Sequence, residues 1–426
     1  MELMVLGGGV AGISAAYHAG KLGREAVIYE ARPRWGGLAD NFTIDGFRFD
    51  HAVHFAFTDD PYLSKIFYRV DYLEHESNPY NYERGRWLKH PVQNNLYPLP
   101  VSEKVEAIRS FVERPHFEEP GNYREWLLGQ YGRVIAERYP EVYTKKYWTV
   151  GAERLTTDWI GQRMYCPGLD EVLFGAMTDE TPALYYFKKM RYPKKGGFRA
   201  FLEAAASGLD IRMEKKAVLI DAAKKYVQFS DGEKCYYENL ATSIPLPDLI
   251  PMIKDAPGEV REAAARLWAT SVAIVSVGFK VPRAGDHLWF YIYDPEMLPA
   301  RVYSPSIKSP DNVPAGCSSL QFEIYFSEQK PLPGTGGAMI EHVVDIIRKM
   351  NFASRDDISL TDFRILPYGN VVFDQGMLPR REKVHKYLAS LDILPIGRFG
   401  EWDYLWSDQC FYSGKKVESF FNAPGV

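Results

Sequence analysis

The sequence is poor in cysteine and has no long apolar run. Its four cysteines are Cys166, Cys235, Cys317 and Cys410, and no CxxC pair occurs. This argues against a disulfide scaffold or a zinc site and fits a reducing, cytoplasmic compartment. No apolar stretch approaches the ~20 residues of a membrane span, and the N-terminal run from Leu3 to Leu6 is too short for a signal peptide.

The chain also lacks an excess of charge of either sign. Lys and Arg together number 51 and Asp and Glu 55, so the formal net charge is -4. This balance argues against a nucleic-acid-binding protein, although a local basic groove for a phosphate is compatible with it. Apolar residues make up 46% of the 426 residues and charged residues 25%, as in globular proteins. At ~150 residues per domain, this length predicts two or three domains.

Tyrosine, in contrast, is abundant. The chain has 28 Tyr, 24 Phe and 9 Trp. Such a composition can reflect an aromatic core. It is equally compatible with pockets for sugars and phosphates, because tyrosine offers both an apolar ring and a hydroxyl group.

A glycine-rich turn follows the first apolar run. Residues 7–12 read GGGVAG, a G-x-G-x-x-G motif between a predicted strand at 2–6 and a predicted helix from Ile13. A second strand ends at Glu30, about 20 residues further on. This setting predicts a dinucleotide site, with the pyrophosphate at the helix N-terminus and Glu30 accepting from ribose hydroxyls. The residues expected to bind the cofactor here are Gly7, Gly9, Val10, Ala11, Gly12, Glu30 and Ala31.

The residues after Glu30 favour FAD as the dinucleotide. Residues 30–37 form an E-x-R-x-x-x-G-G pattern, typical of flavoproteins with an FAD-binding Rossmann domain. Arg32 can neutralise phosphate, and Gly36 and Gly37 let backbone amides approach the flavin. The same cofactor site is predicted to include Leu38, Val218, Gly397 and Arg398. No metal site is expected, because His51 and His54 have no further ligands nearby in the sequence.

The element pattern predicts an α/β protein: an FAD-binding Rossmann domain of the GR2 type, a helical insertion and an antiparallel β-sheet substrate domain. The FAD-binding domain is discontinuous and comprises residues 1–90, 190–265 and 366–426. Residues 91–189 form the helical insertion that lines the substrate cleft. Residues 266–365 form the antiparallel sheet domain, with strand-like runs at 271–279, 287–293 and 317–326.

Seven segments, in order along the whole chain, resemble motifs of the UDP-galactopyranose mutases within the amine-oxidase-like group of FAD proteins. They are 54–59 (HFAFTD), 91–96 (PVQNNL), 143–148 (YTKKYW), 162–164 (QRM), 185–187 (YYF), 366–368 (LPY) and 397–405 (GRFGEWDYL). Two positions depart from the family pattern. Leu38 stands where mutases have an asparagine, and Phe57 stands where they have a second histidine. The nucleoside-binding stretch of the family, around 100–140, has no counterpart here.

The resemblance implies roles for individual residues. Arg163 and Arg398 would grip a nucleotide-sugar diphosphate from opposite walls of a cleft in front of the flavin. Guanidinium groups suit phosphate oxygens. The other residues assigned to the substrate site are His54, near the flavin and sugar, Asn95 in the position of the mutase asparagine, Trp148 along the cleft, and the hydroxyl donors Tyr186, Tyr368 and Tyr404. For Arg163 a surface salt bridge is the structural alternative, and for the tyrosines it is core packing.

The resemblance implies a flavin-dependent isomerase of polysaccharide biosynthesis. It would interconvert pyranose and furanose forms of a nucleotide sugar through an adduct between the N5 atom of reduced flavin and the sugar. The alternatives are a redox FAD enzyme of the amine oxidase or protoporphyrinogen oxidase type and a catalytically silent flavoprotein. The expected partner is the nucleotide-diphosphate sugar. NAD(P)H or another reductant, a homodimer, the sugar, the base and the direction of reaction are left open.

Overall fold

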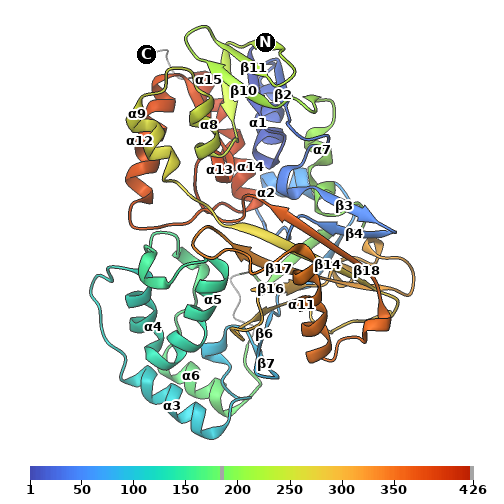
Figure 1. Cartoon of the computed structure of the whole chain (residues 1–426), viewed down its shortest axis with the longest axis vertical. Helices are drawn as coiled ribbons and strands as arrows, with labels where there is room; N and C mark the ends of the chain where they lie inside the picture. Colours follow the sequence, from blue (N-terminus) through green and yellow to red (C-terminus); the bar gives the residue numbers. More distant parts are fainter. Residues whose placement is uncertain (183–186, 423–426) are drawn as a thin grey trace.

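The computed structural model describes residues 1–182 and 187–422. Figure 1 shows a sheet with flanking helices at one end, where both termini lie. A second, larger sheet and a group of helices occupy the other end. The mixture of a Rossmann-like unit with antiparallel sheets confirms the predicted α/β class. Tyr186, predicted at the substrate site, lies outside the described residues.

The first sheet is parallel, with strand order β19-β13-β1-β2-β9. Its strands are β1 (Leu3–Leu6), β2 (Ala26–Tyr29), β9 (Asp210–Arg212), β13 (Asn239–Thr242) and β19 (Ile393–Pro395). All four residues of β1 are buried, as expected for a central strand covered on both faces. Because β13 and β19 come from distant parts of the chain, this sheet unites three separate segments.

Helices from both ends of the chain cover the parallel sheet (Figure 1). The helices of this end are α1 (Val10–Lys21), α2 (Pro61–Phe67), α7 (Glu203–Ala206), α8 (Leu246–Met252), α9 (Gly258–Ala265), α12 (Met377–Ser390), α13 (Gly397–Gly400), α14 (Ser407–Lys415) and α15 (Val417–Asn422). Helix α14 lies directly on α1. Gly414 permits this contact, since a Cβ atom there would lie 2.3 Å from the carbonyl oxygen of Ala11.

The larger sheet has seven strands in the order β18-β14-β17-β16-β15-β6-β7. They are β6 (Tyr80–Glu83), β7 (Arg86–Lys89), β14 (Ser271–Phe279), β15 (Trp289–Ile292), β16 (Arg301–Tyr303), β17 (Ser318–Phe326) and β18 (Ile358–Leu366). Its pairs are antiparallel except β15 with β6. Helix α11 (Gly336–Lys349) packs on this sheet. Strands β6 and β7 belong to this sheet, although residues 1–90 were predicted to lie in the FAD-binding domain.

The helical group consists of α3 (Val101–Val112), α4 (Tyr123–Arg138), α5 (Pro140–Tyr147) and α6 (Leu169–Met177). The connection between α3 and α4 contains Pro115 and Pro120, which cannot continue a helix. Helix α5 contacts β17. It thereby carries aromatic side chains from the helical group to the larger sheet.

Smaller elements complete the fold. Strands β10 (Ala217–Asp221), β11 (Tyr226–Phe229) and β12 (Lys234–Tyr236) form an antiparallel sheet, and the pairs are β3 (Asn41–Ile44) with β4 (Phe47–Asp50) and β5 (Tyr72–Glu76) with β8 (Lys189–Pro193). A short helix, α10 (Pro305–Lys308), follows β16. Within residues 1–182 and 187–422, no helix combines the length and hydropathy needed to cross a bilayer.

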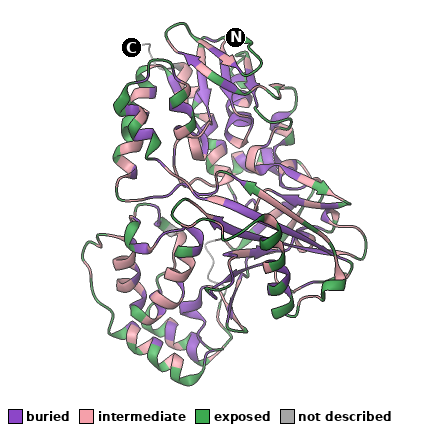
Figure 2. Ribbon diagram, in the orientation of Figure 1, coloured by how far each residue is buried: buried purple, intermediate pink, exposed green. Residues whose placement is uncertain are grey.

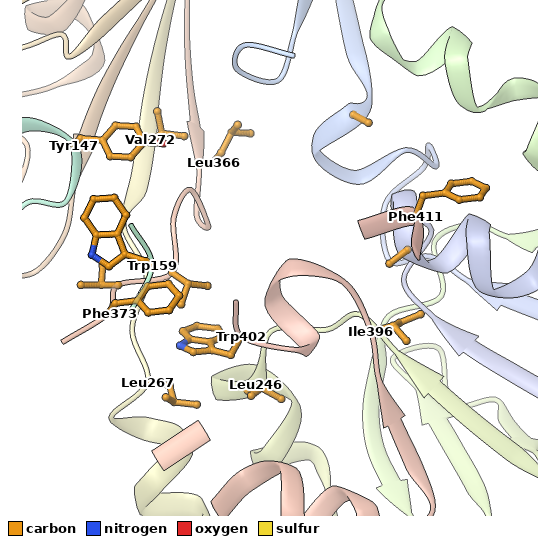
Figure 3. Packing of buried hydrophobic residues seen from close by; sticks show 14 of the residues in the cluster. Tyr147, Trp159, Leu246, Leu267, Val272, Leu366, Phe373, Ile396, Trp402 and Phe411 are labelled. Atoms are coloured by element: carbon orange, nitrogen blue, oxygen red, sulfur yellow. The ribbon is translucent and has the colours of Figure 1, made fainter. Parts of the chain in front are cut away.

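The buried core runs through the whole molecule (Figure 2). One apolar cluster extends from the parallel sheet to the helical group, and a second lies between the larger sheet and α11. Figure 3 shows part of the first cluster, from Ile396 and Phe411 through Trp402 to Trp159 and Tyr147. Continuous packing of this kind fixes the helical group against the cofactor-binding end.

Candidate functional site

A cavity of about 1020 Å³ is lined by residues of the parallel-sheet end, the larger sheet and α5. Of the residues predicted to bind the cofactor, those that line it are Gly7, Gly9, Val10, Ala11, Glu30, Ala31, Arg32, Gly36, Gly37, Leu38, Val218, Gly397 and Arg398. Gly12 does not line the cavity. A Cβ atom at Gly12 would lie 1.9 Å from the carbonyl oxygen of Gly7, so this glycine allows α1 to pack closely against the turn.

The N-terminus of α1 faces this cavity. Gly9 is the N-cap of the helix and provides no side-chain hydrogen bond to the first-turn N–H groups. These groups and the helix dipole favour an anion at this position. A Cβ atom at Gly9 would have Gly37 Cα as its nearest neighbour, at 3.9 Å. The space in front of the helix is therefore open to a pyrophosphate.

Glu30 and Gly397 complete the region around the glycine-rich turn, and we call these residues together the cofactor cradle. The Glu30 carboxylate accepts from the N–H groups of Gly8 (2.7 Å) and Arg32 (2.9 Å). Its oxygens retain lone pairs that can accept from ribose hydroxyls. Opposite, Gly397 has a φ of +74°, and a Cβ atom there would lie 2.8 Å from Ala11 Cβ. An anion site, a ribose acceptor and close-lying glycine backbone fit an FAD-type dinucleotide.

Tyr404 lies at the substrate side of the cavity. Its hydroxyl is 2.7 Å from that of Tyr147, which donates to the Oδ1 atom of Asn370 at 3.2 Å. All three residues line the cavity. Burial holds the pKa of Tyr147 well above its usual value, so this hydroxyl stays protonated. The chain of hydroxyls and amide fixes the orientation of the Tyr404 side chain.

Both predicted arginines pack against the Tyr404 ring. The guanidinium of Arg163 lies 4.7 Å from the ring centroid and donates to the carbonyl oxygens of Trp159 (2.9 Å) and Tyr404 (2.8 Å). The guanidinium of Arg398 lies 5.2 Å from the same centroid and donates to the carbonyl oxygens of Leu405 (2.8 Å) and Gly369 (3.2 Å).

Neither Arg163 nor Arg398 forms an ion pair with a carboxylate in the described parts of the chain. The Arg163 Nε atom is buried and has no hydrogen-bond partner there. The alternative of a surface salt bridge for Arg163 is thus not observed. Arg163 does not itself line the cavity, but Tyr404 and Trp406, on which its guanidinium packs, both do.

The remaining predicted substrate-site residues divide into two groups. His54 and Tyr368 line the cavity. Trp148 and Asn95 do not. Trp148 is buried behind the Tyr404 ring, with their centroids 5.3 Å apart. Asn95 is buried in the helical part, where its amide donates to the carbonyl oxygen of Pro91 at 2.8 Å and accepts from Thr181.

Burial lowers the pKa of His54 to about 4, below its usual value of 6.5. As the pH falls from 6.5 to about 4, the unfolded chain binds a proton at His54 but the native protein does not. The free energy of unfolding should therefore decrease over this range. Thermal unfolding at several pH values should show a larger loss of Tm on acidification for the wild type than for His54→Asn. Equal losses of Tm in the two proteins would contradict the lowered pKa of His54 as the cause.

Sequence reasoning missed a buried charged group on the larger sheet. Arg301 and Tyr325 line the cavity, and both bond the Glu323 carboxylate, Arg301 through Nε and Tyr325 through its hydroxyl, each at 2.8 Å. The other Glu323 oxygen accepts from the backbone N–H of Val53 at 2.8 Å. Glu323 thereby anchors the loop that carries His54. Arg301 and Glu323 pair across β16 and β17, but no local motif marks either residue.

Comparisons with known proteins agree with this architecture. The NAD(P)-binding Rossmann-like domain family matches residues 5–70. A crystal structure of reduced UDP-galactopyranose mutase matches with a TM-score of 0.92 and 25% identity, covering 100% of this chain and 96% of that chain.

Two further structures share the fold. An Exiguobacterium protein provisionally named a protoporphyrinogen oxidase has a TM-score of 0.77 at 16% identity, covering 99% of both chains. A putrescine oxidase bound to putrescine has a TM-score of 0.68 at 14% identity, again covering 99% of both. At these identities the two oxidase structures show the shared fold alone. The similarity to the mutase, together with the Rossmann-like domain, indicates an enzyme with a flavin-type cofactor. The predicted resemblance is confirmed: the chain is a flavoprotein with a UDP-galactopyranose mutase-like fold.

Proposed function

We propose that the protein is an FAD-dependent nucleotide-sugar mutase that interconverts pyranose and furanose forms of its substrate. The observation that carries this proposal is the pair of arginines on Tyr404. Arg163 and Arg398 bond only backbone carbonyls among the described residues and have no carboxylate to balance them. Two such cations beside a dinucleotide cavity favour a doubly charged ligand. The diphosphate of a nucleotide sugar meets this requirement.

Reduced FAD bound at the glycine-rich turn would supply the nucleophile for the anomeric carbon of the sugar. The protein's own contribution is to hold the departing diphosphate. Arg163 and Arg398 would stabilise its charge. Tyr368 would donate a hydrogen bond without adding charge, and Tyr404 would do so by turning its single hydroxyl proton from Tyr147 to a phosphate oxygen. Because Tyr147 and Asn370 orient the Tyr404 hydroxyl, the diphosphate would stay close enough to recombine with the sugar.

A redox FAD enzyme of the amine oxidase or protoporphyrinogen oxidase type is the second candidate. The fold shared with putrescine oxidase supports it, as do the aromatic side chains that line the cavity. An amine substrate, however, is a cation. Arg163 and Arg398 would repel it, so the charge of the site favours the mutase.

Catalysis should require reduced flavin without consuming reductant in proportion to product. The experiment uses dithionite-reduced and oxidised holoprotein with UDP-, dTDP- and GDP-hexopyranoses, and product sugars are separated by chromatography. A single reduction should support many turnovers, because a ring interconversion is redox-neutral. Consumption of one reductant per product would instead favour the oxidoreductase, and the absence of any isomerised sugar would contradict the mutase.

A further inference from the structure

Part of the cavity has side chains that offer no strong hydrogen-bonding group. Phe55, Phe57 and Met190 all line the cavity, and we call these three residues the apolar wall. Phe55 and Met190 are buried, whereas Phe57 is partly exposed. A ligand group that contacts this wall loses its hydrogen bonds to water and contacts only a phenyl ring or a thioether instead.

The Phe57 ring is held firmly in its position. It stacks on Phe187 with a centroid distance of 4.0 Å and an interplanar angle of 13°. It also meets the Trp406 ring edge-on at 5.5 Å. Such contacts restrict rotation of the side chain. The apolar character at this position is therefore a fixed property of the site.

Trp406 connects the apolar wall to the phosphate end. The guanidinium of Arg163 lies 4.7 Å from the Trp406 ring centroid, and the Phe57 ring contacts the same indole. A diphosphate bound at Arg163 would thus place the sugar attached to it close to Phe57. The other ring that the Arg163 guanidinium contacts is that of Tyr404, whose hydroxyl bonds the Tyr147 hydroxyl.

We propose that the sugar of the substrate is a 6-deoxyhexose, with the C6 methyl group against the apolar wall. This inference rests on the proposed mutase function. A pyranose closes through the oxygen on C5 and a hexofuranose through the oxygen on C4, so ring interconversion needs both oxygens. The oxygens on C2, C3 and C6 take part in neither closure. Of these, the C6 group lies on the exocyclic carbon and extends furthest from the ring, so it is the group that can reach Phe57, where a methyl group loses no hydrogen bond.

The test is equilibrium binding to the reduced holoenzyme by titration calorimetry. The probes are UDP-galactose and UDP-6-deoxygalactose, the same two sugars on dTDP, and UDP and dTDP alone. The 6-deoxy sugar nucleotide should bind about ten- to hundredfold more tightly than the hexose on the preferred base. Phe57→His places a hydrogen-bonding group on the wall and should reduce this ratio severalfold. Phe57→Tyr is the second variant, because it keeps the ring and adds only a hydroxyl.

The outcomes separate this inference from the function on which it rests. If the nucleoside diphosphates bind but the hexose binds as tightly as the 6-deoxy sugar, the proposed substrate class is wrong and the mutase proposal stands. An unchanged ratio in both variants that retain flavin also overturns the substrate class. If neither nucleoside diphosphate nor any sugar nucleotide binds, both proposals fail.

Discussion

Replacing Arg398 or Arg163 by alanine should weaken nucleotide-sugar binding by roughly ten- to hundredfold. A charge-assisted hydrogen bond to phosphate contributes ~1.5–3 kcal/mol, and both guanidinium groups lie on Tyr404 without a carboxylate partner among the described residues. Flavin content should stay near normal in Arg163→Ala, because the Arg163 guanidinium packs on Tyr404 and Trp406 at the substrate side and bonds none of the predicted cofactor-binding residues. Titration of the reduced protein with a nucleotide sugar measures the first effect, and flavin absorbance measures the second.

Three further variants sharpen this experiment. Arg133→Ala is the matched control, since Arg133 is exposed on α4 and pairs with Glu137 at 3.3 Å. It should leave binding unchanged. Arg163→Lys and Arg398→Lys keep the charge but lose the planar donor fork, so they should bind with intermediate affinity. Wild-type affinity in both alanine variants would remove the main support for the mutase and favour the redox alternative.

Gly9→Glu should yield protein that has lost its flavin. The substitution places a carboxylate at the N-terminus of α1, where the pyrophosphate of FAD is expected to lie. The added side chain would occupy the anion site, and its charge would repel the phosphates. The purified variant should lack the visible absorbance of flavin. The wild type should release FAD when it is denatured, because we expect the cofactor to be bound without a covalent link.

Gly20→Glu provides the matched control for this loss. Gly20 lies near the other end of α1, and a Cβ atom there has no neighbour within 4 Å. The same substitution at Gly20 should therefore leave flavin bound. Gly9→Ala adds a methyl group where the nearest atom is 3.9 Å away, so it should fold and lose less flavin than Gly9→Glu. Full flavin absorbance in Gly9→Glu would show that the cofactor has been placed wrongly.

The glycine-rich turn and Glu30 could be predicted from the sequence because their determinants are local. Gly7, Gly9, Gly12 and Glu30 lie within one strand–turn–helix–strand unit, where spacing alone determines their relative positions. Two of the three nine-residue strands, β14 and β17, were also predicted, whereas β18 was not. The expected strand at 271–279 matches β14 (Ser271–Phe279). Its nearly continuous apolar character reflects burial of both faces, since Val272 belongs to the first core cluster and Ala273 to the second.

The parts that were missed depend on contacts between distant segments. Arg301 and Glu323 form a buried pair only because β16 and β17 are neighbours, and each residue alone resembles an ordinary charged position in a strand. Asn95 matched a family motif in the sequence, but its side chain stabilises the local turn with Pro91 rather than lining the cavity. Strands β6 and β7 join the larger sheet through β15, which lies far along the chain, so this pairing could not be predicted from residues 80–89 alone.

The contact between α14 and α1 has a consequence for biosynthesis. Strand β19, Gly397, Arg398 and α14 all lie near the end of the chain, yet they complete the site that the first residues begin. During translation the N-terminal strand and α1 are synthesised first. The face of α1 that α14 covers in the complete fold is then still exposed to solvent. The nascent chain therefore lacks part of the cofactor site until the residues through α14 have been synthesised. Tight binding of the cofactor is expected only after that point.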